Sequence, residues 1–222
     1  MAKCQHCSEP NPEGLFNCPS CGKKATDMWV ANNYEKLPDT TWQHITFTLP
    51  NKYWDIFWLN RDLMGLVPAI TANIIKELAH KKKVDIGIFL AIHTFGRDLK
   101  KNYHIHLSTT LYGMSYDKKM IKKLYFHHEL IKKKWKFFIT DLLRRKYKSD
   151  ELILPKSWNI KELRDFNFIL DSLYSKKWVV HLAKSSNDRK RNIEYFGKYL
   201  KRPPIGETRI KFYDGRNAIF RY

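Results

Sequence analysis

The sequence has no long hydrophobic run, no cysteine after residue 21, and few acidic residues. A helix that crosses a membrane needs roughly 18 or more consecutive apolar residues, and no such stretch occurs. The N-terminus also lacks the apolar segment of a secretory signal. We therefore expect a soluble, cytoplasmic protein that has no membrane partner.

The scarcity of acidic residues leaves a large positive charge. Asp and Glu number 22 against 41 Lys and Arg, so the formal net charge of the 222 residues is +19. Hydrophobic residues make up 43% and aromatic residues 14%, enough for a core, which excludes a disordered basic tail. Such a charge on a folded domain implies an anionic partner, either nucleic acid or an anionic membrane surface.

The distribution of the charge favours nucleic acid. The basic residues are spread over many segments and interleave with tryptophans and tyrosines, on whose rings bases can stack. A membrane-binding chain would instead concentrate them in one amphipathic segment. The charge is densest in residues 118–148, for which a solvated helix face is the alternative interpretation.

All cysteines lie near the N-terminus with the spacing C-x2-C-x10-C-x2-C: Cys4, Cys7, Cys18 and Cys21. Two such knuckles can place four thiolates around one structural Zn²⁺, and reducing conditions keep the thiols free for it. A disulfide pair is the alternative. Because so short a segment cannot bury a core, the metal would supply its folding energy. The sequence leaves open whether the segment is only structural or also contacts DNA.

Alternating side chains predict the first strands. Residues 41–49 alternate strictly between apolar and polar, which predicts a strand that buries one face. The polar face carries His44, Thr46 and Thr48. Residues 85–95 and 103–111 are two further strands, and the polar loop between them indicates a hairpin.

Helical periodicity predicts helices in residues 120–148, 160–174 and 188–200. Asp188 is the expected N-cap of the last helix. A strand at residues 177–183 and a hairpin around Asp214-Gly215 complete the pattern. Helices packed on an antiparallel sheet make the fold class α+β. We expect a zinc-binding domain of residues 1–26, a connector of 27–40, and a main domain of 41–222 with a helical insertion at about 118–175.

A pair of histidines is the first candidate site. His104 and His106 lie two residues apart on a predicted strand, so both side chains project from one face and can hold one divalent metal. If the hairpin closes around residues 98–99, His93 lies directly opposite His104 and becomes the third ligand. His44 or a water molecule is the alternative third ligand, and a purely structural pair is the alternative to a metal site.

A pair of tyrosines is the second candidate site. Tyr195 and Tyr199 lie four residues apart on a predicted helix, so the two phenols point the same way. A phenol with a pKa of about 10 is a poor nucleophile until a neighbour takes its proton. Two core tyrosines of an amphipathic helix are the alternative. The nearby cations, which we expect to bind DNA, are Lys198, Lys201, Arg202, Arg189 and Arg191.

Taken in order, the motifs of the chain resemble those of the HUH endonuclease superfamily, and more specifically those of the IS-ninety-one family of two-tyrosine, rolling-circle insertion-sequence transposases. The motifs that carry the resemblance are the cysteine segment, His44-Ile-Thr-Phe-Thr-Leu-Pro50, Asn60-Arg61, His93-Thr-Phe-Gly96, His104-Ile-His106, Trp178-Val-Val180, Tyr195-Phe-Gly-Lys-Tyr199 and Phe220-Arg-Tyr222. One departure is Asn102-Tyr103, where the family has His-Pro.

The resemblance implies an HUH-like central antiparallel sheet flanked by helices. It implies that His104 and His106 hold Mg²⁺ or Mn²⁺, for which His93, placed by the predicted hairpin rather than by the family motif, would be the third ligand. It also implies that Tyr195 and Tyr199 nick and rejoin single-stranded DNA of transposon ends and target through a 5′-phosphotyrosine intermediate. The setting would be a prokaryotic cytoplasm, in association with the nucleoid. The alternatives are a non-catalytic, zinc-dependent nucleic-acid-binding protein and a metal-dependent phosphodiesterase that uses water.

Overall fold

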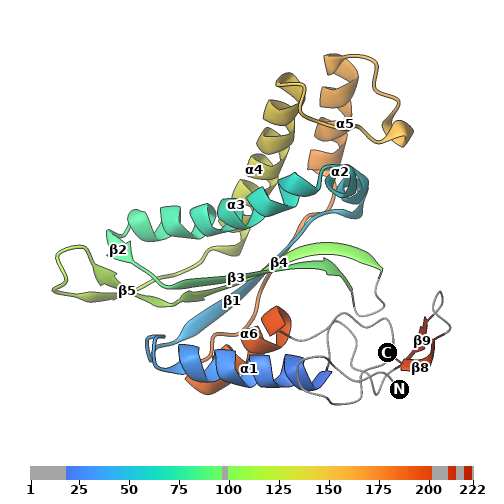
Figure 1. Ribbon diagram of the computed structural model, residues 1–222. Coiled ribbons are helices and arrows are strands. Elements are labelled where there is room, and N and C mark those ends of the chain that lie inside the picture. The colour runs from blue at the N-terminus through green and yellow to red at the C-terminus, as the bar shows by residue number, and fades with distance from the viewer. Residues whose placement is uncertain (1–18, 97–99, 202–209, 214–217, 222) are drawn as a thin grey trace. The chain divides into compact units, whose positions relative to one another are not determined.

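The computed structural model describes residues 19–96, 100–201, 210–213 and 218–221 (Figure 1). It divides into two compact units, one of residues 40–96 and 100–186, and the other of the remaining described residues. Helices and antiparallel sheets make up the described chain, which confirms the α+β class. None of the described helices combines the length and the apolar composition needed to cross a lipid bilayer.

The cysteine segment lies almost wholly outside the described residues. Cys4, Cys7 and Cys18 are not described, and Cys21 lies near the start of the helix α1 (Pro19–Tyr34). The zinc site therefore stays a prediction.

The larger unit is built on a four-stranded antiparallel sheet in the order β3-β4-β1-β7. Its strands are β1 (Trp42–Thr48), β3 (Ile88–Phe95), β4 (Lys101–Thr110) and β7 (Val179–Leu182). The predicted strand at 41–49 and the hairpin of 85–95 with 103–111 are thus confirmed. The central strands β4 and β1 pair along their whole common length, so alternate residues of both strands share a face.

The apolar sides of two helices cover one face of this sheet. In Figure 1, α3 (Arg61–His80) runs along that face, and α4 (His128–Lys148) packs against α3 and β7. Trp135 of α4 is fully buried, with its ring centroid 5.3 Å from that of Phe47 on β1. Phe47 pairs with Ile105 of β4, and both side chains lie in this core. The residues in between, which include the histidines of β1 and β4, therefore project from the opposite face.

Shorter elements complete the unit. They are η1 (Asn51–Tyr53), α2 (Trp54–Leu59), η2 (Lys156–Trp158) and α5 (Leu163–Ser175). The helix α5 begins with a capping box, in which the side chains of Glu162 and Asp165 each accept a hydrogen bond from the other residue's backbone N–H. A second sheet, in the order β2-β5-β6, contains β2 (Val84–Asp85), β5 (Tyr112–Ser115) and β6 (Ile121–Lys123).

The predicted helix of residues 120–148 is wrong at its start. Ile121 pairs with Met114 as part of β6, and α4 begins only at His128. Leu124 and Phe126 are buried while Tyr125 between them is 85% exposed, which is the alternation of an extended chain. The side chain of His127 accepts a hydrogen bond from the Leu130 N–H and so caps the helix there.

The other unit contains α1 and α6 (Arg189–Lys201), together with the hairpin of β8 (Ile210–Tyr213) and β9 (Ala218–Phe220). The Asp188 carboxylate accepts a hydrogen bond of 2.9 Å from the Arg191 N–H, which confirms the predicted N-cap. Gly197 lets α6 approach α1 closely, because a Cβ there would lie 2.9 Å from Cγ2 of Val30. The glycine between the two tyrosines is thus explained by packing within this unit.

Asn60, from the Asn60-Arg61 motif, joins two distant segments of the larger unit. It is buried, and its Nδ2 donates to the carbonyls of Ile56 at 2.7 Å and Ile153 at 2.8 Å. Its Oδ1 accepts from the Ile153 N–H at 2.8 Å. The side chain therefore satisfies both backbone groups of Ile153.

Asn60→Ala should lower the free energy of unfolding by about 2–3 kcal/mol, because the buried Asn60 side chain makes three hydrogen bonds to the backbone, each worth about 0.5–1.5 kcal/mol. Urea unfolding followed by circular dichroism measures the loss. The exposed Asn51 offers a matched control, and its alanine variant should stay within about 0.5 kcal/mol of the wild type. Equal effects of the two substitutions would contradict the role assigned to Asn60.

Candidate metal centre

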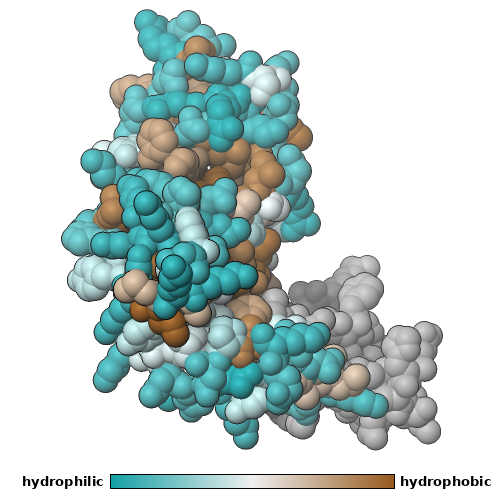
Figure 2. Space-filling view, turned by 90° about the vertical axis from the view of Figure 1, so that its left-hand side faces the viewer, coloured by the Kyte–Doolittle hydropathy of each residue, from teal (hydrophilic) through white to brown (hydrophobic). Residues whose placement is uncertain are grey.

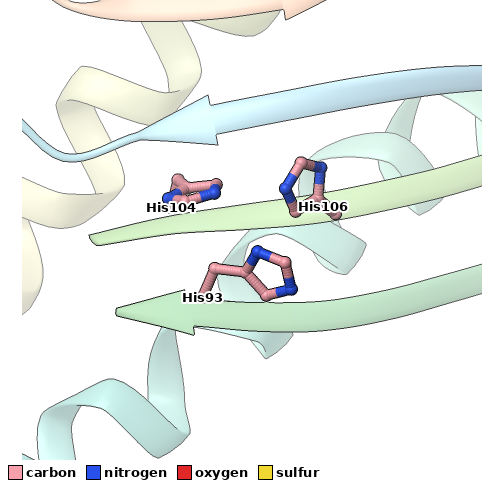
Figure 3. Close-up of side chains that lie close together, drawn as sticks. All are labelled: His93, His104 and His106. Atoms are coloured by element: carbon pink, nitrogen blue, oxygen red, sulfur yellow. The ribbon is translucent and has the colours of Figure 1, made fainter. Parts of the chain in front are cut away.

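Three histidines from two neighbouring strands converge on one face of the four-stranded sheet. The register of β3 and β4 sets His93 directly opposite His104, as predicted, and His106 follows on the same side of β4. The ring centroid of His106 lies 4.6 Å from that of His93 and 4.8 Å from that of His104. One ring nitrogen from each lies within 4.8 Å of the others, and Figure 3 shows the rings gathered over the two strands.

Hydrogen bonds at Nδ1 orient the two histidines of β4. Nδ1 of His104 lies 2.7 Å from the carbonyl oxygen of Asn102, which can only accept, so His104 donates from Nδ1 and keeps its lone pair at Nε2. Nδ1 of His106 lies 3.1 Å from Nε2 of His44. When His106 is the donor of that bond, its Nε2 also carries a lone pair. Metal-binding histidines typically use one ring nitrogen for the metal and the other for such a bond.

Burial keeps these histidines neutral. It lowers the pKa of His106 from 6.5 to about 3, with a further contribution from the neighbouring histidines. It lowers the pKa of His44 to about 4, and His181 adds to that effect. Burial also lowers the pKa of His104, against the opposing effect of its bond to the Asn102 carbonyl. Neutral imidazole is the form that coordinates a metal ion.

The stability of the metal-free protein should therefore fall in mild acid. His44 and His106 have folded pKa values below their unfolded value of 6.5, so the unfolded state binds more protons below that pH. Stability is fully present above pH 6.5 and is lost as the pH falls toward the folded values. At about pH 5 the expected loss is about 2 kcal/mol for each histidine.

Urea unfolding in the presence of EDTA at about pH 7.5 and about pH 5 measures this loss. The variant His44→Phe should lose about 2 kcal/mol of the pH dependence, the share assigned to His44. A stability that does not change between the two pH values would contradict the assignment of these pKa values.

The contact between His106 and His44 depends on strand pairing. Alternation in residues 41–49 predicts that His44 shares the polar face, but only the pairing of β1 with β4 brings it to His106. Thr46 sits between them, with Oγ1 3.5 Å from each ring. The Asn102 carbonyl is likewise a partner that no side-chain motif indicates.

The tyrosine helix belongs to the other unit. Tyr195 lies on α6, half-buried, with its ring centroid 5.8 Å from that of Phe196. Lys198, Tyr199 and Lys201 also lie on α6, near its C-terminal end. The exposed Arg191 lies in its first turn.

Arg189 and Arg202 are the two remaining arginines that we predict to bind DNA. The guanidinium of Arg189 lies 4.4 Å from the centroid of the Tyr34 ring, a cation–π contact between α6 and α1. Arg202 lies outside the described residues.

Residues 87–222 match the family Y2_Tnp, described as "Putative transposase". The chain belongs to this family. The matched region contains the three clustered histidines and both tyrosines. The resemblance of the motifs to those of an insertion-sequence transposase is thereby confirmed.

Two curated relatives of this transposase-family chain give the same result. The chain is 35% identical over 206 residues to "Transposase for insertion sequence element IS801" of Pseudomonas savastanoi pv. phaseolicola, covering 92% of this chain and 50% of the relative. It is 24% identical over 215 residues to "Putative transposase y4qJ" of Sinorhizobium fredii (strain NBRC 101917 / NGR234), covering 93% and 54%. The chain thus spans about half the length of the curated relatives it matches. No solved structure matches it.

Proposed function

We propose that the chain is the part of a transposase that nicks and rejoins single-stranded DNA through a 5′-phosphotyrosine intermediate. The observation that carries the proposal is the cluster of His93, His104 and His106, which offers three converging ring nitrogens on one face of an antiparallel sheet. Membership in a transposase family supports DNA as the substrate. The HUH-type assignment rests on this cluster together with the tyrosine pair of the sequence.

The residues fit a divalent metal ion. All three donors are imidazole nitrogens, and two of them have a lowered pKa that keeps the ring neutral. Of the two expected ions, Mn²⁺ fits this donor set better than Mg²⁺, which prefers oxygen ligands. A bound ion would polarise the phosphate that is cleaved. His44 and the Asn102 carbonyl hold the rings of His106 and His104 in a ligating orientation.

The proposed nucleophile is the hydroxyl of Tyr195 or Tyr199. Its oxygen attacks the phosphorus of a DNA phosphodiester, and the bond from phosphorus to the 3′ oxygen breaks. The phenol loses its proton, and the 3′ oxygen leaves as a hydroxyl after gaining one. The phosphotyrosine ester conserves the bond energy, so a 3′-OH can reverse the step without a nucleoside triphosphate. Two tyrosines would allow a second strand to be cut before the first is released.

The remaining parts have supporting roles in this proposal. The cations near the tyrosines would hold phosphates of the DNA. Residues 1–26 would form a zinc-binding domain, joined through residues 27–40 to the catalytic domain of 41–222. The zinc would stabilise that domain and take no part in cleavage.

A covalent adduct tests the proposal. The full chain is incubated with Mn²⁺ and single-stranded DNA from the ends of an element that encodes it, and the products are run on a denaturing gel. We expect a protein–DNA adduct that survives denaturation and disappears on protease treatment. Cleavage without an adduct would instead indicate a phosphodiesterase that uses water. Binding without cleavage would indicate a non-catalytic nucleic-acid-binding protein, and either result overturns the proposal.

A further inference from the structure

The sheet of β2, β5 and β6 presents an exposed face that the histidine cluster does not use. Tyr112 and Met114 of β5 pair directly with Lys123 and Ile121 of β6, so these four side chains share one face. All four are exposed, and Ile121 is the most exposed of the apolar ones, at 68%. Figure 2 views this end of the larger unit and shows hydrophobic groups bordered by hydrophilic ones.

The aromatic surface extends beyond the strands. The Leu124 N–H donates to the carbonyl of Leu111 at 2.8 Å, so pairing continues past β6. Alternation from Lys123 then places Tyr125 on the same face, at a position diagonal to Tyr112. Tyr125 is the most exposed large hydrophobic side chain of the described residues, at 85%. Tyr112 and Tyr125 are thus both exposed on this face, at 37% and 85%.

Buried residues on the other side of the sheet, and the turn after β5, fix the position of this face. Val84, Gly113 and Ser115 are buried on the other side of the sheet. A Cβ on Gly113 would lie 2.7 Å from the backbone oxygen of Asp85, so only glycine lets β2 approach this closely. The turn after β5 is fixed by Asp117, whose carboxylate accepts hydrogen bonds from the Ser115 hydroxyl and the Lys119 N–H. A rigid surface loses little conformational entropy when a ligand binds.

The hairpin is rich in lysine, with Lys123 on this face and Lys122, by alternation, on the opposite one. Residues 112–125 contain Lys118, Lys119, Lys122 and Lys123, and their only acid is Asp117, which the turn already engages. None of the four lysines forms an ion pair with a residue that the structure describes. In α4, by contrast, Lys134 pairs with Glu77 at 2.8 Å. Lys122 Nζ donates to the Lys82 carbonyl at 3.5 Å, and Lys123 Nζ lies 6.0 Å from the centroid of the Tyr112 ring. Because neither contact neutralises a charge, the positive charge of the hairpin remains available to an anionic ligand.

We propose that this hairpin surface, made of Tyr112, Met114, Ile121, Tyr125 and the adjacent lysines, binds single-stranded DNA. Exposed rings can stack on unpaired bases, whose faces a duplex does not offer, while lysines neutralise the phosphates. A second copy of the chain is disfavoured as the occupant because it also carries a net charge of +19. The inference rests on the proposed function for the choice of DNA, and goes beyond it by locating a contact outside the histidine cluster.

Binding without cleavage tests this surface. The full chain is titrated, in EDTA, into a fluorescein-labelled oligothymidylate of about 20 nucleotides, and fluorescence anisotropy gives Kd. Tyr112→Ala combined with Tyr125→Ala should raise Kd by about 10-fold or more, with little change in the salt dependence. Lys119→Gln combined with Lys123→Gln should reduce the slope of log K against log salt by about 0.7 for each lysine. Phe168→Ala, at a ring on α5 that is 75% exposed, is the control and should stay within about two-fold.

Three results would overturn the proposal. One is an unchanged Kd in a tyrosine variant whose thermal unfolding midpoint is that of the wild type. Another is an equal loss of affinity for duplex and single-stranded DNA. The third is a tyrosine-dependent affinity for vesicles of anionic lipid without one for DNA. Because the titration needs neither metal nor cleavage, a missing covalent adduct would count against the proposed function and leave this surface standing.

Discussion

Replacing His106 by alanine should abolish Mn²⁺ binding and DNA cleavage together while leaving DNA affinity within a few-fold. His106 contributes one of the three clustered ring nitrogens and is the most buried of the three. Loss of a direct ligand should lower metal affinity by more than about 100-fold, since even the loss of a residue that orients a ligand costs 10–100-fold. DNA affinity comes mainly from Lys and Arg contacts with phosphates, which the histidine does not make. Titration calorimetry with Mn²⁺, a cleavage gel and anisotropy measure the three quantities.

Two further histidines of the sheet, His44 and His181, serve as controls with different expected losses of Mn²⁺ affinity. His44→Ala should weaken Mn²⁺ binding by about 10–100-fold, because His44 contacts His106 and lies outside the cluster. His181→Ala should leave metal affinity unchanged, since this exposed histidine of β7 is not part of the cluster. Full cleavage by the double variant His104→Ala and His106→Ala would rule out the metal centre.

Removing both tyrosine hydroxyls should eliminate the covalent adduct. We expect Tyr195→Phe and Tyr199→Phe each to retain some adduct but to fail in strand transfer, because each phenol can act once. Only the double variant should lose all adduct. Phenylalanine keeps the ring and its packing, including the contact of residue Tyr195 with Phe196. A loss of activity therefore reports on the hydroxyl. A denaturing gel with labelled DNA measures the adduct, and a joined-product assay measures transfer.

Tyr34→Phe is the matched control for this pair. Tyr34 lies in the same unit, and its ring contacts Arg189, a contact that phenylalanine preserves. Its adduct should equal that of the wild type. Adduct in the double variant would exclude both tyrosines as nucleophiles. If one single variant were inactive and the other fully active through transfer, the enzyme would work with one tyrosine.

Local patterns predicted the elements of the larger sheet because strand alternation is a short-range property. The polar positions of residues 41–49 and the spacing of His104 and His106 follow from a period of two residues, whatever the strands pair with. The same holds for the start of α6, where the Asp188 carboxylate accepts from a backbone N–H three residues away.

The error at the start of α4 has a physical cause. Residues 120–127 contain basic and apolar side chains that suit either a helix or a strand. The pairing of Ile121 with Met114, made across a turn, decides for the strand. A local pattern does not contain that partner, because tertiary contacts override propensity where the two compete.

The sequence alone was enough to place two histidines on one strand face and to pair His93 with His104, since a short hairpin loop limits the register. It also placed the chain among insertion-sequence transposases through the order of its motifs. The contact of His44 with His106 and the hydrogen bond of His104 to the Asn102 carbonyl came only from the folded structure. So did the close approach of α6 to α1 at Gly197. Each of these joins side chains or backbone groups whose meeting depends on how strands and helices pack, a long-range arrangement that no local spacing encodes.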